Sequence, residues 1–67
     1  MFNVFIWWHQ GGGWWPVWFV RSDGVRGFFH ADRDRAAALG KAEADGVADA
    51  FDGRVARVGE PIDKAEK

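Results

Sequence analysis

The sequence predicts a small α+β domain: a three-stranded antiparallel sheet plus a short C-terminal strand, packed on one face by one α-helix, in the order β-β-β-α-β. Three observations predict this fold class. Aromatic and β-branched residues are concentrated in three runs within positions 2–29, an alanine-rich stretch follows at 33–50, and glycine-containing turns lie between the segments. The 67 residues suffice for one domain, which we place at 1–58, followed by a solvated or frayed tail at 59–67.

The first strand is expected at 2–8, where every residue but Asn3 is apolar. Residues 10–13, Gln-Gly-Gly-Gly, form a flexible turn. The second strand ends at Arg21 and begins at either Trp14 or Val17, because Pro16 cannot donate a ladder hydrogen bond and belongs at an edge, a bulge or a strand start.

Asp23-Gly24 predicts the second turn, because glycine tolerates the positive φ that a tight hairpin requires. A short third strand at 25–29 follows this turn. With the first hairpin closed around residues 9–13, side-chain alternation predicts two apolar faces. One face carries Phe2, Val4, Ile6, Trp8, Trp14, Trp18, Val20, Val25 and Phe29, and the other carries Phe5, Trp7, Trp15, Val17, Phe19 and Phe28, edged by Arg21 and Arg26.

The helix is expected at 33–50, with Asp32 as its N-cap and Asp52-Gly53 as its stop signal, Gly53 taking a left-handed conformation. A last strand covers 54–58. A helical wheel places Ala36, Leu39, Gly40, Glu43, Gly46, Val47, Ala50 and Phe51 on the inner face. Glu43 is expected either to pair with Arg54 or Arg57 in a buried site or to lie at the margin of a narrower interface.

Charge is distributed unevenly along the chain. The net charge is −1, and residues 1–20 contain no Asp, Glu, Lys or Arg. The chain has no cysteine, so disulfides cannot stabilise it, and five Trp and six Phe remain as the main source of buried area. The three glycines and Pro16 interrupt the uncharged segment, which argues against a signal peptide or a membrane span and favours a cytoplasmic location.

Only one helix is available to cover two apolar sheet faces, which is unusual for a one-helix α+β domain. Another copy, a partner, a nucleic-acid base or the tail should cover the second face, or else most of the tryptophans serve the core. Exposed apolar patches mark interaction sites, and Trp and Arg are enriched at binding hot spots. The predicted partner-binding residues are Phe5, Trp7, Trp14, Trp15, Phe19, Arg21 and Arg26.

These observations predict a non-catalytic protein-interaction module, acting as a homodimer or as a small inhibitor or adaptor of a larger protein, of the kind that phages and mobile elements encode. The alternative is single-stranded nucleic-acid binding, in which indoles stack on bases and arginines contact phosphates. We expect no enzymatic activity, no cofactor and no metal. His9 and His30 lack metal-ligand spacing, the glycine run lacks the pattern of a phosphate loop, and one serine offers little as a nucleophile.

Overall fold

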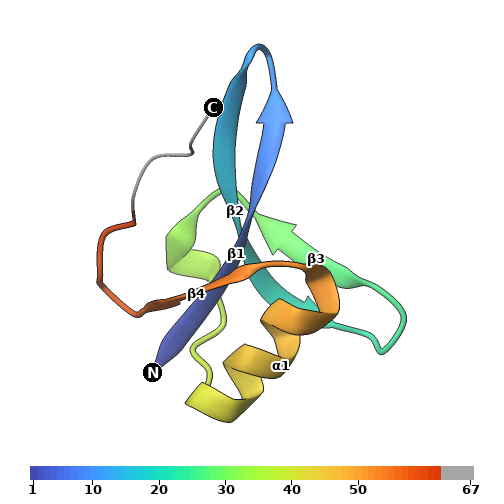
Figure 1. Cartoon of the computed structure of the whole chain (residues 1–67), viewed down its shortest axis with the longest axis vertical. Coiled ribbons are helices and arrows are strands. Elements are labelled where there is room, and N and C mark those ends of the chain that lie inside the picture. The colour runs from blue at the N-terminus through green and yellow to red at the C-terminus, as the bar shows by residue number, and fades with distance from the viewer. Residues whose placement is uncertain (63–67) are drawn as a thin grey trace.

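The computed structural model describes residues 1–62 and confirms the α+β class. A four-stranded antiparallel sheet has the order β3-β2-β1-β4 and carries one α-helix (Figure 1). The third strand begins and ends later than predicted, and the fourth ends one residue earlier. The elements are β1 (Phe2–Gln10), β2 (Gly13–Ser22), β3 (Gly27–His30), the 3-10 helix η1 (Arg33–Arg35), α1 (Lys41–Phe51) and β4 (Arg54–Arg57).

The turn between β1 and β2 has two residues. Gln10 pairs with Gly13, and Gly11 and Gly12 between them have φ values of 63° and 82°. Two successive residues with positive φ give the tight turn whose twist matches that of the flanking strands, and glycine adopts this conformation without steric cost. The hairpin therefore closes more tightly than the predicted turn around residues 9–13.

This closure shifts the pairing of β2 against β1 by one residue, so the predicted composition of the two faces is wrong. Trp8 stands opposite Trp15 and Phe5 opposite Trp18. A one-residue shift moves every side chain of a strand to the other face, because side chains alternate with a period of two. The face toward α1, called the helix face, carries Val4, Ile6, Trp8, Trp15, Val17 and Phe19, and the opposite face carries Asn3, Phe5, Trp7, His9, Trp14, Pro16 and Trp18.

Pro16 lies inside β2, which begins at Gly13, so a strand beginning at Val17 is wrong. Pro16 is paired with Trp7 of β1, whereas β3 pairs only with residues 18–22 of β2. Among the described residues no strand pairs with the other side of β2 at Pro16, where a missing N–H costs no ladder hydrogen bond.

The predicted helix at 33–50 is wrong in its first half. Residues 33–35 form η1, the chain is extended from Ala36 to Gly40, and α1 begins at Lys41. Asp32 is the predicted N-cap, but of η1, where its side chain accepts a hydrogen bond from the Asp34 N–H at 2.9 Å. The extended segment joins the sheet: Leu39 exchanges two main-chain hydrogen bonds with Phe2, and the Ala37 N–H donates to the Phe19 carbonyl. Tertiary pairing thus overrides the helix propensity of the alanines.

The buried stripe of α1 lies one residue further along the chain than predicted, because residues 36–40 do not belong to the helix. Ala44 is fully buried, and Val47, Ala48 and Phe51 pack with it on the helix face. Glu43 is exposed, which excludes the buried pair with Arg54 or Arg57. Gly40, Gly46 and Ala50 of the predicted inner face are also exposed.

The residues after α1 exchange their predicted roles. Asp52, not Gly53, adopts the left-handed conformation (φ 56°, ψ 43°) that ends the helix. Gly53 is needed for another reason: a Cβ atom there would lie 2.8 Å from the Phe5 carbonyl oxygen. The helix can therefore turn closely into β4 beside β1.

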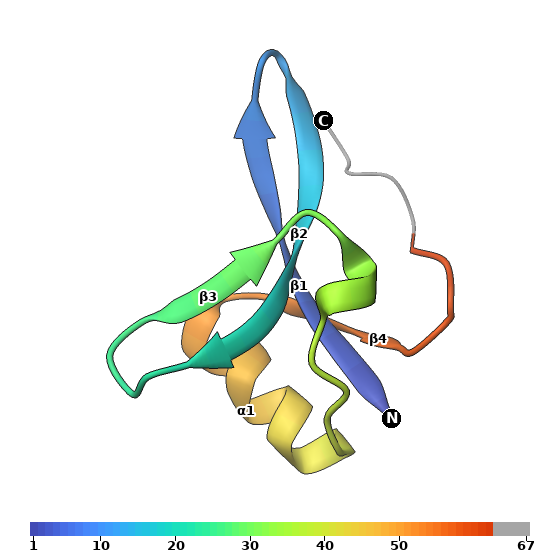
Figure 2. The same ribbon diagram turned by 180° about the vertical axis from the view of Figure 1, so that it is seen from behind.

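The opposite face is partly covered by the chain itself. Ala36 and Ile62 pack against Phe5, Trp18 and Ala56, on the side of the sheet away from α1, where η1 lies in Figure 2. The packed part of the chain thus continues past the predicted boundary at residue 58, and residues 63–67 of the predicted tail lie outside the described residues. The chain's own segments around Ala36 and Ile62 therefore cover the part of this face that lies beside β4.

Candidate functional site

Residues 6–17 form a two-stranded ribbon that extends beyond the rest of the sheet, and we call it the hairpin arm. β4 pairs with β1 only as far as Phe5, and β3 pairs with β2 only from Trp18 onward. In Figure 1 the arm rises above the other strands, away from α1. Residues 6–17 contain no charged side chain, and four of the five tryptophans lie in them.

Trp8 and Trp15 form a cross-strand pair on the helix face of the arm, where α1 does not reach. Their side chains are 53% and 59% exposed. Directly opposite residues of an antiparallel pair lie about 5 Å apart at Cβ, so the two indoles form one contiguous apolar patch. The Trp15 Nε1–H donates to the Gln10 carbonyl at 3.2 Å, which ties this indole to the end of β1.

The opposite face of the arm carries Trp14, which is 38% exposed and packs against the tilted ring of His9, with ring centroids 4.8 Å apart. Trp7, deeper on the same face, presents its ring edge-to-face to Phe5 at 5.5 Å. Trp7 also packs against the cluster of Phe5, Trp18 and Ala56, so it is half-buried. On this opposite face, the exposure of the indoles therefore increases from Trp18 through Trp7 to Trp14, toward the tip of the arm.

The structure separates the predicted partner-binding residues. Phe5 and Phe19 are buried, 4% and 5% exposed, and they lie on opposite faces of the sheet, so their placement on one accessible face is wrong. Phe19 packs with Phe29 and Phe51 beneath α1. Both residues are core residues and cannot contact a partner without unfolding.

Trp14 and Trp15 are exposed on the arm as predicted, but on different faces, and Trp7 is only half-buried between arm and core. Trp8 was missed. A two-residue loop at Gly11-Gly12 would have paired Trp8 with Trp15, so the glycine run contained the missing signal.

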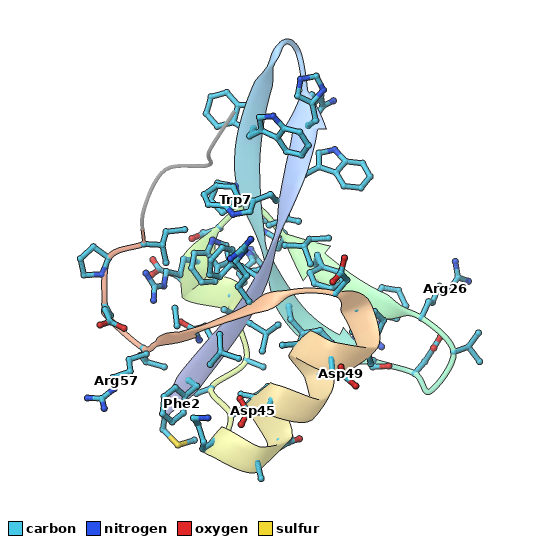
Figure 3. All side chains as sticks on the ribbon, viewed as in Figure 1. Phe2, Trp7, Arg26, Asp45, Asp49 and Arg57 are labelled. Atoms are coloured by element: carbon cyan, nitrogen blue, oxygen red, sulfur yellow. The ribbon has the colours of Figure 1, made fainter. Side chains whose placement is uncertain are left out.

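The two predicted arginines lie at the other end of β2. Arg21 stacks over the Phe28 ring at 4.2 Å, and Arg26 is exposed in the turn before β3. Arg21 lies six positions after Trp15 along β2, about 20 Å at the usual rise per residue. In Figure 3, Arg26 lies on the turn before β3, well away from Trp7. The arginines and exposed indoles therefore do not form one surface.

The histidine and acidic side chains near η1 take part in local hydrogen bonds. Within residues 1–62 no cluster of three or more His, Asp or Glu side chains could hold a metal ion. Asp32 has a structural partner in its cap, and His30 Nδ1 accepts the Asp32 N–H at 2.9 Å. In the same part of the chain, α1 is too short to cross a membrane.

Comparison of the chain with protein-family models, with curated proteins and with solved structures finds no match.

Proposed function

We propose that this chain is a non-catalytic protein-interaction module that binds through the indoles of the hairpin arm. The observation that supports this most directly is the cross-strand pair Trp8–Trp15, with more than half of each side chain in solvent. Large apolar side chains exposed together mark interaction surfaces, and tryptophan is among the residues most enriched at binding hot spots.

The architecture of the arm supports the same proposal. A two-stranded hairpin is at best marginally stable alone in water. On the helix face, the hydrophobic cluster that α1 packs against includes neither Trp8 nor Trp15 among the described residues. These indoles therefore contribute less to the core than Phe5 or Phe19 do, although each exposes more apolar area than any core residue. Binding a partner would bury this area. The module would act by self-association or as a small inhibitor or adaptor, and a phage or mobile-element origin and a cytoplasmic location remain part of the proposal.

Single-stranded nucleic-acid binding is the competing function, because exposed indoles can also stack on bases. The separation of about 20 Å between Trp15 and Arg21 weighs against it, since neither Arg21 nor Arg26 lies beside the exposed indoles to contact phosphates. Quenching of tryptophan fluorescence by a single-stranded oligonucleotide at low salt would favour nucleic acid over protein.

The test is affinity capture from the native cells with immobilised chain, in three forms: wild type, Trp8→Ala/Trp15→Ala, and Val25→Ala. Val25 is 90% exposed in the turn before β3, so its variant removes an exposed apolar side chain away from the arm. We expect wild type and Val25→Ala to retain the same protein, whether a second copy or another chain, and the double variant to lose it. Equal capture by all three forms would exclude the arm as the binding surface.

A further inference from the structure

The edge of β1 along the hairpin arm offers main-chain hydrogen bonds to another strand. Phe2 exchanges two main-chain hydrogen bonds with Leu39, on the β2 side of β1. Successive residues of a strand direct their main-chain groups to alternate sides. The even-numbered residues of β1 therefore direct their N–H and C=O groups toward β2. Phe5, Trp7 and His9 direct theirs to the β4 side.

β4 reaches only Phe5 on that side. Arg54 pairs with Phe5 and is the first residue of β4, and within residues 1–62 no strand pairs with Trp7 or His9 there. The open edge of β1 consists of residues 7–10. It contains no charge, no proline and no bulge, which are the features that keep an edge strand from pairing with another chain.

The two edges of the arm differ. On the β2 side, Pro16 stands at a position whose main-chain groups point outward, so this edge lacks a donor. The proline blocks extension of the sheet beyond β2, whereas the β1 edge keeps both of its outward N–H groups. A pairing strand would thus be directed to β1.

We infer that the occupant of the β1 edge is a second copy of this chain, joined antiparallel through residues 7–10 to form one continuous sheet. The inference rests on the proposed function and names the partner of the same arm. A two-fold axis brings an edge onto its own copy, and residues 7–10 carry no charge, so the copies meet without like-charge repulsion. A charged partner would find no complementary group on this stretch.

The pairing also places the exposed indoles favourably. In both copies the odd-numbered residues of β1 direct their main-chain groups to the shared edge. An odd-numbered residue of one copy therefore pairs with an odd-numbered residue of the other, and an even-numbered residue with an even-numbered one. Both Trp8 side chains then lie on the same face, next to their Trp15 neighbours. The exposed parts of Trp8 and Trp15 on this face offer roughly 250 Å² per copy, or about 500 Å² for two, an apolar contribution toward the ~1,200 Å² of a small stable interface.

Sedimentation equilibrium over a series of protein concentrations measures the mass, and amide hydrogen exchange by NMR locates the interface. We expect the mass to rise from 7.5 kDa toward twice that value. The Trp7 and His9 amides should become protected as the mass rises. The Trp14 amide, which points outward on the β2 edge, should continue to exchange rapidly and serves as the internal control.

His9→Pro removes one outward N–H from the β1 edge, as Pro16 already does on the β2 edge, and His9→Ala is the matched control that keeps the N–H. Each dimer loses two equivalent hydrogen bonds. His9→Pro should therefore raise the dissociation constant of the dimer about 30-fold relative to His9→Ala. Near-ultraviolet circular dichroism checks that both variants remain folded. The wild-type exchange data keep the test decisive if His9→Pro does not fold.

A wild-type mass of 7.5 kDa at all concentrations would overturn the inference. So would a dimer in which the Trp7 and His9 amides stay unprotected, because it would use another surface. The capture experiment with Trp8→Ala/Trp15→Ala distinguishes the two proposals. A monomer that still captures another chain through the arm refutes only the second copy, whereas a monomer that captures nothing refutes the arm as a binding site as well.

Discussion

At the scale of single residues, Gly53 shows how closely the chain segments approach. A Cβ atom at this position would lie 2.8 Å from the Phe5 carbonyl oxygen and 3.2 and 3.3 Å from the Ile6 and Val4 side chains. The carbonyl belongs to the main chain of β1, so it cannot move without disturbing the sheet. Gly53→Ala should therefore destabilise the fold by about 1–3 kcal/mol, measured as the free energy of unfolding in urea.

Gly46→Ala is the matched control for this prediction. Gly46 lies inside α1, and a Cβ there would meet no atom within 4 Å. Alanine removes the entropic cost of glycine in a helix, so this variant should stabilise the fold by about 0.5–1 kcal/mol. If the two variants changed the free energy of unfolding equally, the close contact at Gly53 would not be the cause.

At the scale of elements, the turn between β2 and β3 is organised by one carboxylate. Asp23 Oδ1 accepts the N–H groups of Arg26 and Val25, each at 2.9 Å, and Ser22 Oγ accepts the Gly24 N–H. The hydrogen bond from the Arg26 main chain, and then that from Val25, hold the pKa of Asp23 below its usual 3.8. These bonds favour the ionised form, because only the carboxylate accepts both donors without competition from its own proton.

The lowered pKa gives stability a pH dependence whose sign is fixed. Because the folded pKa lies below that of the unfolded chain, the contribution of Asp23 is fully present above about pH 4 and disappears as the pH falls through the folded value. Urea unfolding of wild type and Asp23→Asn between about pH 5 and about pH 2 measures it. The stability advantage of wild type should shrink toward acid, and a constant difference across this range would contradict the prediction.

At the scale of the whole molecule, the sequence predicts those features that depend on neighbouring residues along the chain. The class, the Asp23-Gly24 turn, the Asp32 cap and the order of the elements follow from propensity and turn residues. The half of the predicted helix that is extended was not predictable in this way, because Ala37 and Leu39 are held by hydrogen bonds to Phe19 and Phe2, distant in sequence. Alanine-rich composition contains no information about such partners.

The candidate site depended on a smaller distinction. The tryptophan-rich segment itself identifies the arm, but which indoles share a face depends on whether the hairpin loop has an even or odd number of residues. Three consecutive glycines permit either closure, so Phe5 and Phe19 were placed together on one face although both are core residues on opposite faces. Register, not composition, decides which aromatic side chains a partner could contact.

Arg33 connects the segments that enclose the opposite face of the sheet. Its guanidinium stacks over the Trp18 ring at 4.3 Å, and its Nε donates to Asn3 Oδ1 at 3.2 Å. Its terminal nitrogens donate to the carbonyls of Arg57, at 2.7 Å, and Glu60. One side chain from η1 therefore holds β1, the end of β4 and the residues that lead to Ile62, in a chain without disulfides.

Arg33→Ala should accordingly destabilise the fold by about 2–3 kcal/mol, since it removes several charge-assisted hydrogen bonds and a cation–π contact together. Arg33→Lys keeps the charge but not the planar set of donors, so it should recover only a minor part of this loss. Arg35→Ala, an exposed arginine of the same η1, is the control and should change stability by less than about 0.5 kcal/mol. Urea unfolding compares the three. Full recovery by Arg33→Lys would show that the charge alone, rather than the geometry that joins β1 to β4, stabilises this face.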